Sequence, residues 1–279
     1  LRDEVSTRLM AHLEGMVLEP SDILCWQPLC AGHLALNQLK DRFPKAKHHF
    51  WQESDSAKAL LRSSTHSKGW GQMIKRAWTG AGNSAWHPFE LKGNAQADLV
   101  YTSLALHNEP DPMAVIQAWA NCLRPQGVAI FSCWGPDTLK ELRALYSKMG
   151  WSEPMHPLVD MHNWGDLLVQ NGLSDPVMDM EYLTLTYERV EVLMSDLRFL
   201  GRNLNPTRVQ TLRPRAFRQA LTVALEEERI RLGGRLSLTF EVVYGHAFKG
   251  MPKATMQGET QVSLQDMKLH LKTKRSPSA

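Results

Sequence analysis

Short apolar runs alternate along the chain with stretches whose apolar residues recur at helical spacing. The runs predict strands at residues 22–26, 47–52, 97–104 and 128–133, with a third-strand position near residues 86–89. The helical spacing predicts helices at residues 5–13, 34–42, 56–62, 112–123, 136–149 and 161–171. Such alternation is typical of a parallel sheet with crossover helices, so we expect an α/β protein.

Two local signals refine this pattern. Residues 124–127 read Arg-Pro-Gln-Gly, which predicts a turn between a helix and the strand that follows it. Asp137 lies near the start of the helix predicted at residues 136–149, and we interpret it as an N-cap.

The pattern changes in the last third of the chain. Residues 178–187 alternate apolar and polar positions, which predicts a half-buried antiparallel strand. Helices are predicted at residues 190–200 and 214–231, and residues 236–248 predict a last strand. Together these elements predict a doubly wound, seven-stranded, mostly parallel sheet.

We expect one domain at residues 1–249, with a helical, arginine-rich insert at residues 188–235 before the last strand. Residues 250–279 are polar and basic with little periodicity, which predicts a disordered tail.

Composition fits a soluble globular protein, because 43% of the 279 residues are hydrophobic and 22% are charged. No C-x-x-C pair occurs among the four cysteines, Cys25, Cys30, Cys122 and Cys133. We expect them to be reduced and buried in a cytoplasmic protein, without a metal site. No apolar run approaches the roughly 20 residues that span a bilayer, so no membrane contact is expected.

The net charge of +3 is unevenly distributed. The segment from Arg198 to Arg235 carries nine arginines, no lysine and no aspartate. Such a segment predicts an acidic partner, although a solvated helical face is an equal alternative. Nucleic acid is disfavoured because no aromatic stacking platform is interleaved with the arginines.

Six stretches carry a family resemblance: residues 97–107 (ADLVYTSLALH), 122–131 (CLRPQGVAIF), 135–143 (GPDTLKELR), 160–168 (DMHNWGDLL), 175–181 (DPVMDME) and 239–246 (TFEVVYGH). The first two resemble the fourth and fifth strands of class I S-adenosylmethionine-dependent methyltransferases. Together the six resemble the malonyl-acyl-carrier-protein O-methyltransferase family of biotin synthesis. A mitochondrial relative that assembles respiratory complex I shares the Gly-x-Asp-Thr-Leu-x-Glu-Leu stretch. The resemblance covers about residues 1–249 and is specific from residue 97 onward.

The resemblance implies a Rossmann-like fold, S-adenosylmethionine as methyl donor, and a malonyl carboxylate on acyl carrier protein as acceptor. A carboxylate is already nucleophilic at neutral pH, so holding donor and acceptor in line supplies most of the catalysis.

The resemblance also implies positions for donor binding. An acid and three glycines of the family's turn fall on Cys25, Gln27, Leu29 and Ala31, with Gly32 one place out of register. The acid that accepts from the ribose hydroxyls falls on Gln52, with Glu53 next to it, and the nearest acid to the adenine position is Glu90. Ser103, on the fourth strand, completes the candidate donor-binding set.

On the acceptor side, His107 follows the fourth strand and is a candidate for the acceptor pocket or a structural histidine. Tyr101 and Ser103 share one face of that strand, toward either a pocket or a helix. Arg198 and Arg202 are candidates to bind the malonyl carboxylate bidentately. Acyl carrier protein, or another acidic protein, would dock on the remaining arginines, Arg208, Arg213, Arg215 and Arg218.

The altered donor turn leaves three interpretations open: an active methyltransferase with an unusual donor site, a non-catalytic homologue that binds a protein partner, or a respiratory-complex assembly factor. Five tryptophans lie in the first 90 residues: Trp26, Trp51, Trp70, Trp78 and Trp86. We hypothesise that such side chains fill the space that a donor would occupy.

Overall fold

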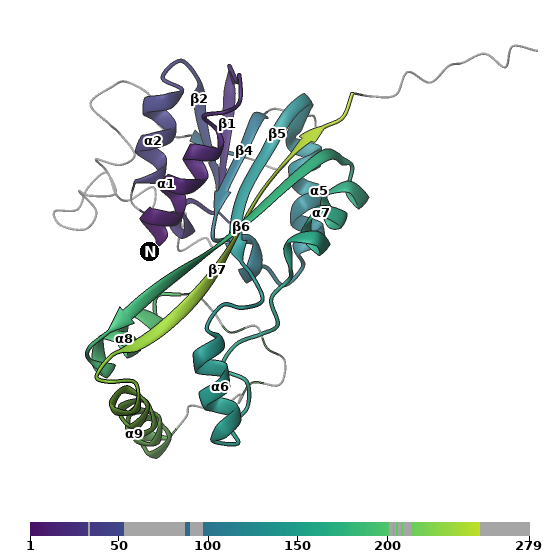
Figure 1. Cartoon of the computed structure of the whole chain (residues 1–279). Helices are drawn as coiled ribbons and strands as arrows, with labels where there is room; N and C mark the ends of the chain where they lie inside the picture. Colours follow the sequence, from purple (N-terminus) through teal and green to yellow (C-terminus); the bar gives the residue numbers. More distant parts are fainter. Residues whose placement is uncertain are drawn as a thin grey trace, which may run out of the picture.

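A seven-stranded sheet forms the centre of the computed structural model, with strand order β3-β2-β1-β4-β5-β7-β6 (Figure 1). The structure describes residues 1–32, 34–52, 87–89, 97–200, 203, 205, 208 and 214–251. The strands are β1 (Asp22–Trp26), β2 (Lys47–Trp51), β3 (His87–Pro88), β4 (Ala97–Ser103), β5 (Leu123–Trp134), β6 (Leu173–Tyr187) and β7 (Leu236–Lys249). Strands β1 to β5 pair in parallel, whereas β7 runs antiparallel to both β5 and β6. The predicted fold is therefore confirmed.

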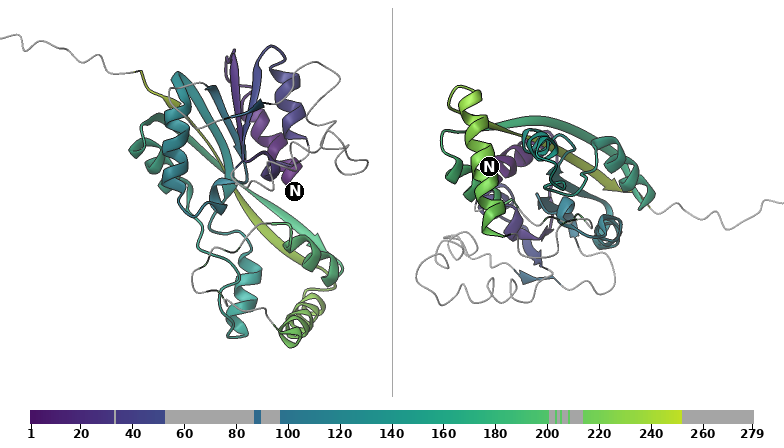
Figure 2. Two further views of the ribbon diagram at one scale, coloured as in Figure 1. Left: turned by 180° about the vertical axis from the view of Figure 1, so that it is seen from behind. Right: turned by 90° about the horizontal axis from the view of Figure 1, so that it is seen from below.

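Helices cover both faces of this sheet. They are α1 (Arg2–His12), α2 (Ala35–Arg42), α5 (Pro112–Cys122), α6 (Lys140–Lys148), α7 (Met161–Gln170), α8 (Val190–Leu197) and α9 (Arg215–Arg231), with two 3-10 turns, η1 (Pro28–Cys30) and η2 (Leu106–Asn108). Helices α1 and α2 lie on one face and α5 and α7 on the other, while α6, α8 and α9 gather beside the far end of the β6–β7 ribbon (Figures 1 and 2). No helix among the described residues is long and apolar enough to cross a membrane.

The alternation of β1 divides the core into two clusters. Ile23 and Cys25 pack with α1 and α2, whereas Leu24 and Trp26 pack with α5 and α7. All four side chains are buried because the strand lies between β2 and β4 with a helix layer on each face.

Residues 124–127 form a bulge within β5, so the predicted turn is wrong. Ala97 of β4 pairs with Leu123, but Leu99 pairs with Val128, and the residues between them bulge from the ladder. Gln126 has φ 66°, and a Cβ on Gly127 would lie 2.9 Å from the Arg124 carbonyl oxygen.

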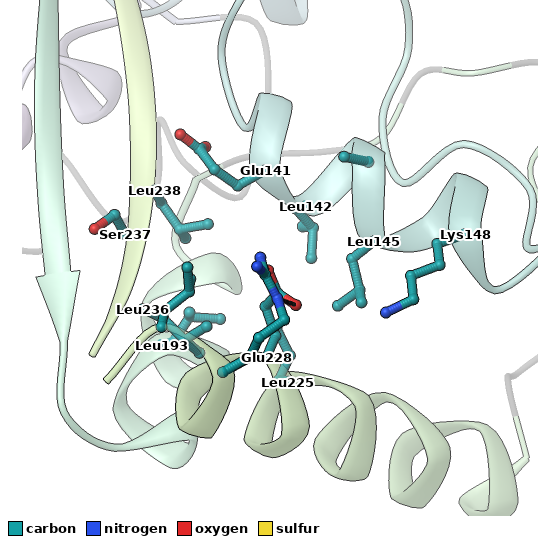
Figure 3. A pocket seen from close by; sticks show the side chains of 13 residues that line it. Glu141, Leu142, Leu145, Lys148, Leu193, Leu225, Glu228, Leu236, Ser237 and Leu238 are labelled. Atoms are coloured by element: carbon teal, nitrogen blue, oxygen red, sulfur yellow. Dashed lines mark hydrogen bonds and ion pairs between the residues drawn. The ribbon is translucent and has the colours of Figure 1, made fainter. Parts of the chain in front are cut away.

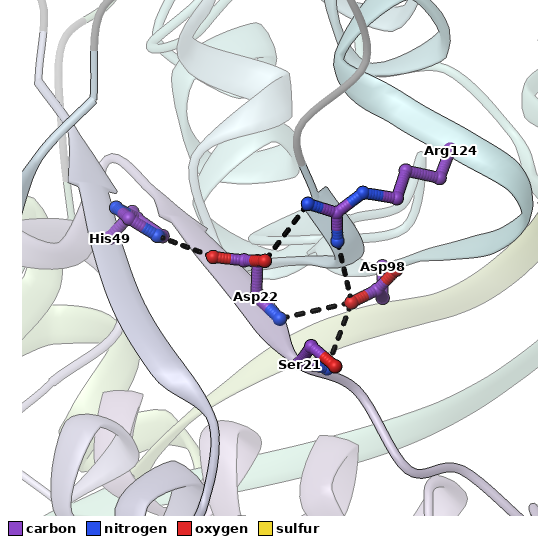
Figure 4. A network of polar contacts seen from close by, with 5 residues as sticks. All are labelled: Ser21, Asp22, His49, Asp98 and Arg124. Carbon is purple, nitrogen blue, oxygen red and sulfur yellow. Dashed lines mark hydrogen bonds and ion pairs between the residues drawn. The ribbon is translucent and has the colours of Figure 1, made fainter.

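The bulge places Arg124 between two carboxylates at the start of β1 and β4 (Figure 4). Its guanidinium donates to Asp98 Oδ2 at 2.8 Å and to Asp22 Oδ2 at 2.9 Å, and His49 Nε2 lies 3.0 Å from Asp22 Oδ1. Burial raises the pKa of the Asp22 carboxyl, but hydrogen bonds from His49 and Arg124 outweigh it and the pKa is lowered. This cluster joins β1, β2, β4 and β5 at their amino-terminal ends.

Helix α6 begins at Lys140, after residues 136–139, and the prediction that Asp137 is an N-cap is wrong. Leu139, with φ 58°, occupies the N-cap position instead. Asp137 donates its backbone N–H to Glu241 Oε2 at 2.6 Å, and its carboxylate accepts from Tyr182 Oη at 3.1 Å. The turn is held by β7, a contact distant in sequence.

The helix predicted at residues 56–62 lies outside the described residues, as do residues 252–279 of the tail predicted at residues 250–279.

Candidate functional site

Three polar side chains meet at the carboxyl edge of the parallel strands, where open α/β sheets bind their ligands. Gln27 follows β1, Gln52 follows β2, and Glu109 follows β4 and η2. Gln27 Nε2 donates to Glu109 Oε1 at 3.2 Å, and Gln27 Oε1 accepts a hydrogen bond from Gln52 Nε2. We call Gln27, Gln52 and Glu109 the amide cluster.

The cluster is largely withdrawn from solvent, since Gln27 and Gln52 are each 7% exposed. Gln52 Oε1 is buried and has no hydrogen-bond partner within the described part of the chain. A buried carbonyl oxygen without a donor is costly, so this position can accept a hydrogen bond from an incoming group.

Gln27 adopts the backbone conformation that glycine normally provides. Its φ is 51° and its ψ is 54°, in the left-handed region, and its N–H donates to the Trp51 carbonyl oxygen at 2.8 Å. The chain therefore turns sharply after β1 without a glycine at this position.

Helix α1 holds the turn that follows. Asp3 Oδ1 accepts from Leu34 N at 3.0 Å, Arg2 Nη1 donates to the Leu29 carbonyl oxygen at 3.4 Å, and the Ser6 hydroxyl bonds the Ala31 carbonyl oxygen. A Cβ on Gly32, at φ 88°, would lie 2.4 Å from Asp3 Oδ1. Gly32 thus lets α1 approach the turn.

Cys25 and Leu29 face the same helix. Cys25 is fully buried, and burial raises the pKa of its thiol, so the side chain is neutral. Leu29 is partly buried and packs against the α1–α2 core cluster. Cys25 therefore does not supply the carboxylate that the family has at its position, and Leu29 does not leave the space that the family's glycine leaves.

Tyr101 and Ser103 also point toward α1, which decides between the two faces considered for them. Tyr101 Oη lies 3.4 Å from the Ser6 carbonyl oxygen, and Ser103 Oγ lies 3.0 Å from both Ser6 Oγ and Ser132 Oγ. Within the described residues, the hydroxyl of Ser103 thus bonds side chains of α1 and β5.

Two tryptophans stack on the other face of the sheet. The rings of Trp26 and Trp51 are 3.9 Å apart with an interplanar angle of 21°, and Trp119 meets Trp26 edge-on at 6.2 Å. Trp26 is 2% exposed, so its ring belongs to the core. Trp70, Trp78 and Trp86 lie outside the described residues, as do Glu53 and Glu90.

His107 lies in η2, with both ring nitrogens engaged. Nδ1 accepts from Trp134 N at 3.3 Å, Nε2 lies 3.0 Å from Asn108 Nδ2, and the His107 carbonyl oxygen is 2.8 Å from His156 Nε2. Burial, with smaller effects from His156 and Arg2, lowers the pKa of His107 to about 3. The ring is therefore a neutral group with partners inside the protein.

Four of the six arginine candidates are described, and all four lie on the surface. Arg198 caps α8 and is exposed, as are Arg208, Arg215 and Arg218. Arg202 and Arg213 lie outside the described residues. Among the residues that the structure describes, no cluster of three or more His, Cys, Asp and Glu side chains could hold a metal ion.

Glu109 does not stand out in the sequence. Its signal is its place two residues after His107, at the end of the fourth strand, but the partner that gives it a role follows the first strand. The family resemblance points to Gln27 and Gln52, but it does not predict the hydrogen bond between them.

Comparison with known proteins identifies the family. A malonyl-[acyl-carrier protein] O-methyltransferase of Gallionella capsiferriformans is 34% identical over 261 residues, which cover 92% of this chain and 87% of the relative. The protein of the same name from Laribacter hongkongensis is 35% identical over 252 residues, 89% of this chain and 82% of the relative. No family model matches the chain.

Solved structures agree on the fold. A methyltransferase-type protein from Bacillus halodurans superposes with a TM-score of 0.57 at 12% identity, covering 89% of this chain and 100% of that one. The YcgJ protein from Bacillus subtilis superposes with a TM-score of 0.55 at 11% identity, covering 89% and 99%. By its sequence relatives, the chain belongs to the malonyl-[acyl-carrier protein] O-methyltransferase family.

Proposed function

We propose that this protein transfers a methyl group from S-adenosylmethionine to the free carboxylate of a malonyl group on acyl carrier protein, a step of biotin synthesis. Support comes from relatives of that name that align over most of their own length. The unpaired state of the four cysteines, three of them buried, supports a cytoplasmic location.

The observation that carries the proposal is the unpartnered Gln52 Oε1 in the amide cluster. It stands where the family's ribose-binding acid falls, at the carboxyl edge of the sheet, and a ribose hydroxyl would satisfy it. The left-handed Gln27 keeps the sharp turn that such a site uses. The residues present therefore fit a ribose, with Gln52 as acceptor and the backbone at Gln27 beside it.

The reaction needs no proton transfer from the protein. When bound, S-adenosylmethionine would supply an electrophilic methyl group to a malonyl carboxylate oxygen and would leave as the neutral thioether. The chain's task is to hold the acceptor in line and exclude water. We assign Arg198 and Arg202 to the malonyl carboxylate, and His107, which is neutral, to the wall of the acceptor pocket.

A second candidate is a non-catalytic homologue that binds a protein partner. The hydrogen bond between Gln27 and Gln52 favours it, because these side chains occupy space that the family's glycine turn leaves open for the donor. The Trp26–Trp51 stack adds bulk beside the same strand ends.

Titration calorimetry with S-adenosylmethionine separates the two. The methyltransferase predicts micromolar binding, weakened about tenfold by Gln52→Leu, which removes the acceptor proposed for the ribose. The matched change Gln117→Leu, on the exposed surface of α5, should leave binding unchanged. Absence of binding at millimolar donor, together with no methylation of malonyl carrier protein, would overturn the first candidate in favour of the second.

A further inference from the structure

A cavity of about 420 Å³ lies between α6, α8, α9 and the start of β7, beyond the end of the sheet (Figure 3). Its base is formed by six leucines that are each at most 7% exposed: Leu142, Leu145, Leu193, Leu225, Leu236 and Leu238. Figure 3 shows these side chains converging from α6, α8, α9 and β7 on one space. Its volume lies in the range of small-molecule pockets in proteins.

The rim of the cavity is exposed and charged. Ala144, Lys148, Arg231 and Leu232 are exposed, in contrast to the leucines at the base. Polarity thus rises from base to mouth, the gradient that suits an amphiphile whose apolar end enters first.

The rim charges are not equivalent. Arg231 is paired with Glu228, its Nε 2.9 Å from Glu228 Oε2. Glu141 accepts from the backbone N–H of Thr239 at 2.9 Å and bonds the hydroxyl of the same residue. Lys148 forms no ion pair with any described residue, although its charge helps to lower the pKa of the Glu228 carboxyl, so it is the rim cation without a carboxylate in direct contact.

We propose that this cavity is a binding site for an unbranched acyl chain with an anionic head group. The leucine base would bury the hydrocarbon, and the Lys148 ammonium would face the anion at the mouth. A malonyl group is short and polar and would not cover the apolar surface of the leucines. The site shares no residue with the amide cluster, so the inference stands independently of the proposed methyl transfer.

Titration of the full chain with octanoate, decanoate and 1-octanol tests the proposal. We expect saturable binding at one site per chain, and about tenfold tighter binding of decanoate than octanoate, because each buried CH₂ contributes about 0.8 kcal/mol. Ala144→Phe, which puts a ring in the mouth from an exposed helical position, should abolish binding of all three probes.

Lys148→Glu should weaken octanoate binding roughly fivefold, because the rim cation is exposed, and leave 1-octanol unaffected. Lys45→Glu, the same charge change on an exposed residue after α2, should alter neither. Octanoyl-phosphopantetheine distinguishes the source of the chain: tighter binding than octanoate indicates a carrier-bound thioester, and weaker binding a free acid.

Binding that is unsaturable, absent, or insensitive to Ala144→Phe would overturn the site. If Lys148→Glu weakens the binding of octanoate and of 1-octanol equally, the proposed anionic head group is overturned.

Discussion

In the proposed donor site, Gln27 and Gln52 would stand at the positions where the family resemblance expects a glycine and an acid. Gln27 holds a left-handed backbone that costs a non-glycine residue about 1–2 kcal/mol. Its side-chain amide offsets that cost through bonds to Gln52 and Glu109. Because the amide has one carbonyl oxygen and one NH₂ group, it orients both neighbours and leaves Gln52 Oε1 as the unsatisfied acceptor.

Restoring the family's residue types at these two positions should strengthen donor binding. In Gln27→Gly/Gln52→Glu the backbone strain is relieved, and a carboxylate replaces the amide that faces the ribose. A charged acceptor adds about 1–1.5 kcal/mol to a hydrogen bond, so S-adenosylmethionine affinity should rise about tenfold. Calorimetry measures this affinity, and the surface change Gln117→Glu serves as the control that should leave it unchanged. Unchanged or weaker binding would contradict the assignment of Gln52 to the ribose.

The buried ring of His107 should make the stability of the fold depend on pH. Its folded-state pKa of about 3 lies below the unfolded value of about 6.5, so between these pH values the unfolded chain takes up a proton that the folded chain does not. This group therefore stabilises the fold above pH 6.5 and lowers stability as the pH falls, by up to about 1.4 kcal/mol per pH unit.

His107→Gln should flatten that dependence by about one proton. Urea unfolding between about pH 4 and 6.5 gives the slope. His48, whose pKa burial lowers to about 4, keeps a residual slope in the variant. The exposed His162→Gln should leave the wild-type slope intact, and a His107→Gln slope equal to the wild-type slope would mean that His107 is protonated in the fold.

At the scale of elements, the sequence predicts what local pattern determines and misses what distant contacts determine. Strand β1 has the predicted bounds because four consecutive apolar residues after Asp22 carry a complete local signal. The bulge in β5 and the late start of α6 depend on Asp98, Asp22 and Glu241, which are far away in the chain. The amide cluster is missed for the same reason, since its members follow three different strands.

Close packing between β5 and β7 gives an element-scale prediction. A Cβ on Gly245 of β7 would lie 2.6 Å from the Phe131 ring of β5 and 2.9 Å from Met178 Cε of β6. Gly245→Ala should therefore destabilise the protein by about 1–3 kcal/mol in urea unfolding. Gly250→Ala should have little effect, because a Cβ there would lie 3.8 Å from its nearest neighbour, Ser174 Oγ. Equal stability of the two variants would show that β7 shifts freely.

At the scale of the whole molecule, the charges of α9 are divided along its length. Near its C-terminus, Arg229 and Arg231 are paired with Glu226 and Glu228. In its first turn, Arg215 and Arg218 are exposed and form no ion pair within the described chain. Cations at a helix N-terminus oppose the helix dipole, so these two arginines do not serve helix stability. This favours the proposed carrier-protein surface over a merely solvated insert.

Arg215→Glu/Arg218→Glu should weaken binding of malonyl carrier protein about tenfold at low ionic strength, because two attractive charges become repulsive. The same change should stabilise α9 by a few tenths of a kcal/mol or more, so lost binding would not reflect unfolding. Fluorescence anisotropy with labelled carrier protein, at low and at about 0.15 M ionic strength, measures both the loss and its screening by salt. Lys45→Glu serves as the matched control, and S-adenosylmethionine affinity should be the same in all three proteins. Carrier affinity that is equal in the α9 variant and the wild type at low salt would place the acidic partner elsewhere on the molecule.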